Sequence, residues 1–175
     1  ARLHAAVLHG IDAIPCEVEV DHAERAEAGP RPTIVGLPDT AVKESLDRIR
    51  SALFNSGYGF PDGRLTINLA PADVKKEGNA LELPIALGIL AVNRVLSVAA
   101  LEKAKRFLIA GELALDGRIR PVKGALPIAM LAQGLGEQGI VGVIVPADNA
   151  QQAAVVPGIE VYSVGALAEL VGFLN

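Results

Sequence analysis

The chain has 175 residues, of which 51% are hydrophobic and only 3% aromatic, so it is long enough for one domain whose core is built from Ala, Val, Ile and Leu. Its 21% of charged residues excludes a disordered chain, and its net charge of −4 excludes a general attraction to phosphate backbones. Any contact with nucleic acid must therefore come from a local basic patch.

The first predicted elements are two strands, at residues 5–8 and 16–20, joined by a turn around Gly10. Residues 16–20 alternate between apolar and acidic side chains, which predicts one buried and one solvated strand face. The polar stretch 22–32 is typical of a mobile loop, and residues 33–35 are predicted to form a short strand that ends at Gly36.

A helix is predicted to begin at Asp39 or Thr40, either of which can cap it, and to end at Gly57. Its apolar stripe consists of Val42, Leu46, Ile49 and Leu53. On the exposed side, Glu44 and Arg48 have the i,i+4 spacing of an ion pair.

Residues 65–69 are predicted to form a strand, and an apolar helix follows over residues 80–93, with Pro84 close to its first turn. The dipeptide Asp116–Gly117 predicts a hairpin between residues 107–115 and 118–122.

The helix after Gly124 is predicted to turn Leu126, Met130 and Leu131 toward the core. Residues 141–145 are fully apolar and predict a buried strand, and short helices near Asn149 and over 164–174 bracket a last strand at 160–163. Strands come first and alternate later with helices. This order predicts one α/β domain of the α+β type over residues 1–175, with a mixed sheet covered by helices.

The familiar catalytic and cofactor motifs are missing from the sequence. No lysine is followed by Ser or Thr, which excludes a phosphate-binding P-loop. The histidines stand alone in the sequence, and the single Cys16 excludes both an intrachain disulfide framework and a cysteine-based metal site. No serine lies in a glycine-rich elbow beside a positioned base. We therefore expect no catalytic residue, no cofactor and no metal in this domain.

The longest apolar run, residues 81–96, contains Glu82, Pro84, Asn93 and Arg94, which is typical of a buried helix rather than a membrane span. No secretory leader opens the chain. We expect a cytoplasmic protein with no membrane contact.

Two stretches, KKEGNALELPIAL at 75–87 and GELALDGRIRPV at 111–122, resemble the proteolytic domain of Lon. This resemblance implies the ribosomal-protein-S-five domain-two-like fold. In Lon the first stretch leads into the helix of the nucleophilic serine, and the second leads into the helix of the catalytic lysine. Those two positions are occupied here by Ala80 and Leu126, so the resemblance implies a degenerate catalytic dyad.

Further motifs resemble the magnesium-chelatase-like family called ComM or YifB, and they cover nearly the whole chain. They are TIVGLPD at 33–39, AVKES at 41–45, NSG at 55–57, NLAPAD at 68–73, LPIALG at 83–88, GEL at 111–113 and VPADN at 145–149. This resemblance implies a Lon-like N-terminal domain that precedes an AAA+ ATPase module. It also implies a hexamer that acts on branched DNA in natural transformation.

The chain differs from the family pattern in its loop 21–31, which is longer and more charged, and it ends at Asn175 before any ATPase module. We interpret it as the isolated N-terminal domain. ATP and Mg²⁺ are expected in the ATPase module, and the expected partners are that module, sister subunits of the hexamer, and branched or single-stranded DNA.

Three functions remain open from the sequence. The first is a non-catalytic accessory domain that serves assembly or DNA engagement, and the others are a divergent Lon-like peptidase and a protein-interaction module of a chelatase-type complex. For the first, residues 73–78 and 117–124 are predicted to meet at one rim of the sheet. The candidate DNA contacts there are Lys75, Lys76, Arg118, Arg120 and Lys123. A solvated surface of paired charges is the competing interpretation of these residues.

Overall fold

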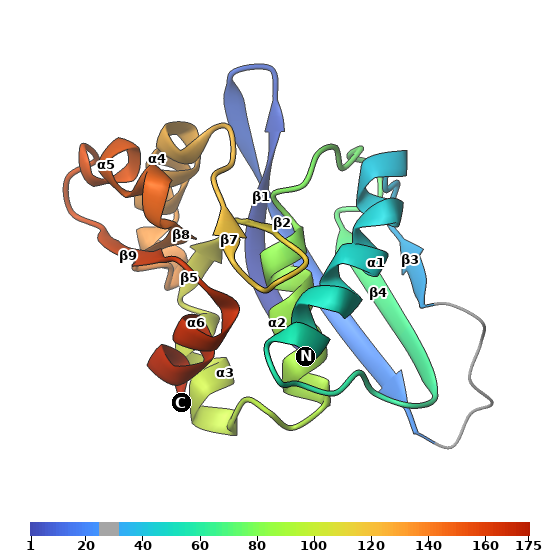
Figure 1. The fold of residues 1–175 in the computed structure, drawn as a ribbon. Coiled ribbons are helices and arrows are strands. Elements are labelled where there is room, and N and C mark those ends of the chain that lie inside the picture. The colour runs from blue at the N-terminus through green and yellow to red at the C-terminus, as the bar shows by residue number, and fades with distance from the viewer. Residues whose placement is uncertain (25–31) are drawn as a thin grey trace.

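The computed structural model describes residues 1–24 and 32–175 (Figure 1). Within this part of the chain a seven-stranded sheet has the order β3-β4-β2-β1-β5-β8-β9. The strands are β1 Arg2–His9, β2 Asp12–Ala23, β3 Thr33–Val35, β4 Arg64–Ala70, β5 Phe107–Ile109, β8 Gly142–Pro146 and β9 Glu160–Val164. A separate small sheet consists of β6 Glu112–Leu113 and β7 Ile119–Arg120.

The α-helices of the described residues are α1 Thr40–Asn55, α2 Glu82–Val92, α3 Val98–Ala104, α4 Ala125–Gly134, α5 Ala150–Ala154 and α6 Leu167–Leu174. Two 3-10 helices, η1 Gly136–Gln138 and η2 Ala147–Asn149, lie near α4 and α5 in the chain. The helix α3 is not among the elements predicted from the sequence. None of these helices has the length and apolar character needed to cross a lipid bilayer.

The main sheet is mixed, as the sequence predicts. Strands β1 and β2 pair antiparallel, as do β2 and β4, while the other neighbours in the sheet pair parallel. The protein is therefore an α/β fold with a central sheet that is mostly parallel and flanked by helices.

Alternate residues of the central strands enter two separate cores. Leu3, Ala5 and Val7 of β1 belong to the core beneath α1, α2, α3 and α6. Ala6 and Leu108 point to the opposite core, beneath α4 and α5. This period of two places helices on both faces of the sheet.

The helix α2 lies inside the larger core. Its residues from Glu82 to Leu90 are all buried, which explains why this part of the sequence is apolar on every side. At Gly88 an added Cβ would lie 2.5 Å from Val20 Cγ2, so the glycine lets the helix approach β2 closely.

The structure corrects the sequence predictions for the hairpin and for the helix α4. The predicted hairpin is confirmed as β6–β7, but β5 leaves it and pairs in the main sheet with β1 and β8. On α4, Leu126 and Met130 are exposed rather than inward, and the buried residues are Ala125, Ile128, Ala129 and Ala132. The predicted loop 22–32 begins later than expected, because His22 and Ala23 belong to β2 and pair with β4. Residues 25–31 of this loop lie outside the described residues.

Candidate functional site

A pocket of about 650 Å³ opens at the end of the sheet where the β1–β2 hairpin turns. We call it the rim pocket. It is lined by Ala6–Leu8 and Gly10 of the hairpin, Asp39 before α1, residues 77–80, Glu112, residues 121–123 and Ile128 of α4. The loop before α2 and the loop before α4 therefore meet at one end of the sheet, through residues 77–78 and 121–123. These segments gather at the upper end of the molecule in Figure 1. The rest of the predicted rim lies elsewhere, because Gly117 packs against Ser56 at the other end of α1.

Of the two positions of the Lon-like dyad, only that of Ala80 is among the described lining residues of the rim pocket. Ala80 lines the rim pocket and is half-buried, and its carbonyl oxygen accepts a hydrogen bond from the Gly111 N–H at 3.0 Å. Leu126 is 41% exposed on α4 and does not line the pocket. Among residues 1–24 and 32–175, those that line this pocket include no hydroxyl, thiol or imidazole side chain.

Asp39 connects the start of α1 to the loop before α2. Its Oδ1 accepts from the Val42 N–H at 2.8 Å and caps the helix, and its Oδ2 accepts from the Gly78 N–H at 3.3 Å. The Asp39 N–H donates to the Lys76 carbonyl at 3.0 Å. The loop geometry on this side of the pocket is thus fixed by one carboxylate and the backbone around it.

A buried carboxylate lies behind the pocket. Glu82, at the start of α2, has a side chain only 1% exposed, and its Oε1 accepts from Arg48 Nη2 at 2.6 Å and Nε at 2.8 Å. Its Oε2 accepts from the Leu113 N–H at 2.7 Å. Burial raises the pKa of Glu82, and the hydrogen bonds from Arg48 and Leu113 oppose that rise.

The polar network continues from Arg48 to the pocket wall. Arg48 Nη2 donates to Asn79 Oδ1 at 3.3 Å, Asn79 Nδ2 donates to Glu112 Oε2 at 3.3 Å, and Glu112 Oε1 lies 3.9 Å from Arg120 Nη1. These bonds join α1, the loop before α2 and the β6–β7 sheet. The predicted Glu44–Arg48 pair is wrong, because Arg48 pairs with Glu82 instead. The one sequence signal for this network was a glutamate inside an apolar run.

Three of the candidate DNA contacts are close to carboxylates. Lys75 Nζ lies 2.7 Å from Glu77 Oε1, Arg118 Nε lies 2.7 Å from Asp116 Oδ2, and Arg120 lies near Glu112. Lys123 lines the rim pocket and has no ion pair with a described residue.

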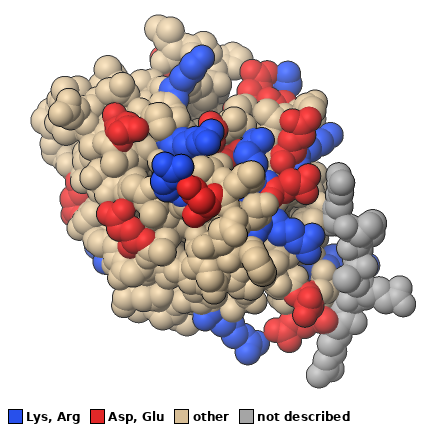
Figure 2. Space-filling view, viewed as in Figure 1, with Lys and Arg blue, Asp and Glu red and all other residues tan. Residues whose placement is uncertain are grey.

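The face of the molecule in Figure 2 carries acidic and basic side chains interspersed, without a continuous basic area.

Lys76 is a correction to the candidate set. Its side chain is fully buried, and its Nζ donates to the Pro71 carbonyl oxygen. Burial lowers its pKa. A buried ammonium cannot reach a phosphate on the surface, so Lys76 is not a DNA contact in this structure.

The fold defines the class of protein as a mixed α/β domain, in which the described residues that line the rim pocket carry no hydroxyl or thiol. A family model described as subunit ChlI of Mg-chelatase matches residues 18–149. The chain belongs to this magnesium-chelatase-like family, together with YifB and ComM.

The similar proteins are much longer than this chain. It is 42% identical to YifB of Escherichia coli over 89% of this chain and 29% of that protein. It is 43% identical to the competence protein ComM of Haemophilus influenzae over 82% of this chain and 27% of that protein. An uncharacterized protein of Mycobacterium tuberculosis is 38% identical over 99% of this chain and 33% of its own length. The chain thus spans a third or less of the curated relatives it matches.

Proposed function

We propose that this chain is a non-catalytic accessory domain of a magnesium-chelatase-type ATPase, and that it assists subunit assembly and the engagement of branched DNA. The observation that carries the proposal is the rim pocket, in which Ala80 stands at the nucleophile position among lining residues without a hydroxyl or thiol. Covalent acyl transfer needs such a group beside a base.

The energy source of the parent protein belongs to another module. The 175 residues contain no P-loop sequence, so ATP and Mg²⁺ would be held by the ATPase module. The partners that follow from this proposal are that module, sister subunits of a hexamer in the cytoplasm, and branched or single-stranded DNA. The name of the relative from H. influenzae, a competence protein, supports a parent protein that acts in competence.

DNA contact would be made through phosphates. Arg118, Arg120 and Lys123 are exposed and lie on one hairpin strand and the loop that follows it. Their acidic neighbours reduce the attraction of one copy for DNA, so binding is expected to need several copies around one strand. Only six aromatic residues are present in the chain, two Tyr and four Phe, which favours phosphate contact over base stacking.

The DNA component is tested by a salt titration of branched-DNA binding with this chain joined to its ATPase module. Replacing Arg118, Arg120 and Lys123 with alanine should weaken binding and make the slope of log affinity against log salt less negative, by up to about 3. The matched control replaces Arg2, Arg64 and Arg106, exposed residues at the other end of the strands β1, β4 and β5. If both triple variants bind alike, these cations do not contact DNA, and assembly alone remains as the role.

The assembly component is tested by native mass spectrometry of the parent protein with and without residues 1–175. We expect the shortened protein to lose hexamers at low micromolar concentration. An unchanged hexamer fraction would remove assembly from the proposal.

The peptidase alternative is tested with fluorescently labelled casein. The wild-type chain is expected to release no peptides. Sustained cleavage would contradict the proposal that the domain is non-catalytic. If a serine-protease inhibitor did not abolish it, the cleavage would require a nucleophile other than serine.

A further inference from the structure

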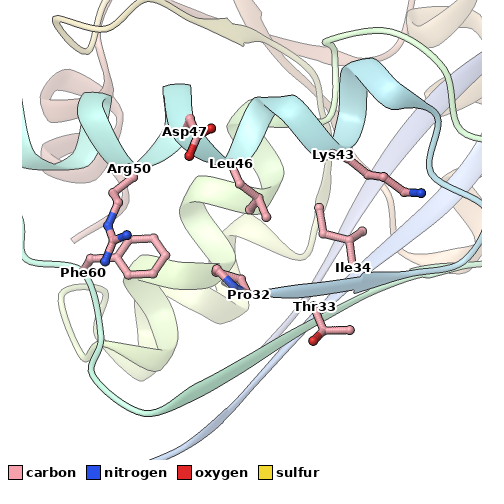
Figure 3. A pocket seen from close by; sticks show the side chains of 8 residues that line it. All are labelled: Pro32, Thr33, Ile34, Lys43, Leu46, Asp47, Arg50 and Phe60. Carbon is pink, nitrogen blue, oxygen red and sulfur yellow. The ribbon is translucent and has the colours of Figure 1, made fainter. Parts of the chain in front are cut away.

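A second pocket, of about 530 Å³, lies between α1 and the edge strand β3. We call it the helix–edge groove. Figure 3 shows Leu46 of α1 pointing toward Ile34 of β3, with Phe60 at one end of the groove. Lys43 and Arg50 extend from α1 at opposite ends, and Asp47 is the single acidic residue among the described residues of the lining.

One side of the β3 backbone makes no hydrogen bond within the described residues. Strand β3 is at the end of the sheet order and pairs with β4 alone among the described strands. Residues 33–35 make no other backbone hydrogen bond to the described residues. Among residues 1–24 and 32–175, the N–H and C=O groups of this three-residue strand that point away from β4 have no backbone partner, which is the arrangement that an added strand can use.

The two cations frame an apolar centre. Lys43 and Arg50 lie two helical turns apart, roughly 10 Å along the axis of α1. The Arg50 guanidinium carbon lies 4.8 Å from the centre of the Phe60 ring, a cation–π contact that holds it at the mouth of the groove. Neither cation forms an ion pair within residues 1–24 and 32–175.

We propose that the helix–edge groove binds an extended peptide segment of a protein partner, which adds to β3 as a further strand. Side chains at alternate positions of an extended peptide point to the same face, and positions i and i+4 lie roughly 13 Å apart. A segment with an apolar residue between two acidic residues, in the order acidic–x–apolar–x–acidic, matches this groove. The apolar side chain contacts Ile34 and Leu46, and the two carboxylates reach Lys43 and Arg50.

Main-chain pairing with an exposed edge is a recurring mode of peptide recognition, in which backbone bonds supply affinity and side-chain pockets supply specificity. With only a few backbone bonds and two exposed ion pairs, we expect a dissociation constant on the order of 0.1–1 mM for a short peptide. The inference stands apart from the proposed DNA contact, which involves Arg118, Arg120 and Lys123.

The test uses NMR titration of the isotopically labelled 175-residue chain with the end-blocked peptide TEVLVET and its charge-reversed counterpart TKVLVKT. We expect TEVLVET to shift the backbone amides of residues 33–36 and the side chains of Leu46 and Phe60, and TKVLVKT to shift neither. A third peptide, TEVSVET, lacks the apolar centre and should bind more weakly.

Charge exchange makes the test specific. The double variant Lys43→Glu, Arg50→Glu should lose binding of TEVLVET by about fivefold or more and should gain binding of TKVLVKT. The variant Arg106→Gln, at an exposed arginine outside the groove, should bind as the wild type does. Circular dichroism checks that each variant is folded.

Three results would overturn the proposal. The first is no saturable shift at residues 33–36 in the millimolar range, and the second is equal binding of both charged peptides. The third is occupation of the same residues by oligothymidylate or by a second copy of the chain, seen as amide shifts that follow the added DNA or the protein concentration alone.

Discussion

The carboxylate of Glu82 lies in an apolar core, which disfavours its charged form. Its side chain is 1% exposed, whereas its partner Arg48 is 31% exposed, so the ion pair links the interior to the surface. Burying a carboxylate is costly unless it is paired and fully hydrogen-bonded, and here Arg48 and the Leu113 N–H together provide that pairing.

Replacing Arg48 with methionine should destabilise the domain by about 3 kcal/mol near neutral pH, because Glu82 is left charged and unpaired. Burial already raises the pKa of Glu82 above its ordinary value of 4.5, so the folded state binds this proton more tightly than the unfolded chain does. Glu82 therefore lowers stability as pH rises through the folded pKa, and loss of Arg48 moves that pKa higher. Urea unfolding should show a larger loss at about pH 7 than at about pH 5.

The matched control is Glu44→Gln, at the residue that sequence spacing paired with Arg48. Since Arg48 contacts Glu82 instead, the change should alter the free energy of unfolding by less than about 0.5 kcal/mol. A loss of unfolding free energy comparable to that of Arg48→Met would show that Glu44 does pair with Arg48 along the helix.

Cys16 should be unreactive in the folded protein. Burial raises its pKa from 9.0 to about 11, against a smaller opposing effect of Lys76, and its side chain is almost inaccessible. Ellman's reagent at neutral pH should therefore label the thiol only after unfolding in guanidinium chloride. Rapid stoichiometric labelling of the native chain would show that the strand β2 opens there.

At the scale of elements, the sequence pattern predicts the buried residues correctly for α2 but not for α4. The apolar run of α2 predicted a buried helix, and Pro84 lies in its first turn as expected. On α4 two apolar stripes compete, Leu126 with Met130 and the smaller set Ala125, Ile128, Ala129 and Ala132. Side-chain size alone favours burial of the larger pair. The structure buries the smaller ones, because alanines let the helix lie close to the sheet.

The reversed face of α4 has a direct consequence for stability. Leu126→Gln and Met130→Gln should each change the free energy of unfolding by less than about 0.5 kcal/mol, whereas Ile128→Ala should cost about 2–5 kcal/mol. Urea unfolding of the three variants measures this. A large loss at Leu126 would contradict its exposed position.

The close contact between α2 and β2 predicts a specific sensitivity at Gly88. An added methyl group would press against Val20, so Gly88→Ala should destabilise the domain by about 1–3 kcal/mol in thermal or urea unfolding. Gly134, the last residue of α4, has no atom within 4 Å of an added Cβ. Gly134→Ala should be neutral or slightly stabilising, and equal losses at both glycines would contradict the packing argument.

The candidate site was less predictable than the fold. Alternation in β2, the cap at Asp39 and the Asp116–Gly117 turn are local signals, and each appears where the sequence placed it. Burial of Lys76 and pairing of Arg48 with Glu82 depend on segments far apart in the chain. No spacing rule along one helix or loop contains that information.

For the whole molecule, the helices cover the two faces of the sheet unequally. Helix α4 lies over β5, β8 and the start of β2, and α5 lies over β8 and β9. The same face of β2 from Glu17 onward, and of β4, carries polar side chains. There Arg2 pairs with Glu17 and Glu19, and Asn68 Nδ2 donates to Glu19 Oε2 at 2.7 Å. The polar side chains on this part of the sheet thus pair with one another through ion pairs and hydrogen bonds.

The central place of β1 in the sheet governs the order in which a growing chain can fold. Strand β1 leaves the ribosome before the other strands of this sheet, and β2 can pair with it almost at once. Its other neighbour, β5, begins only at Phe107. Until then a nascent chain can complete only the half-sheet β3-β4-β2-β1, with one edge of β1 open. An open strand edge beside apolar side chains invites association with other chains, so this interval of synthesis is when the domain most needs a chaperone.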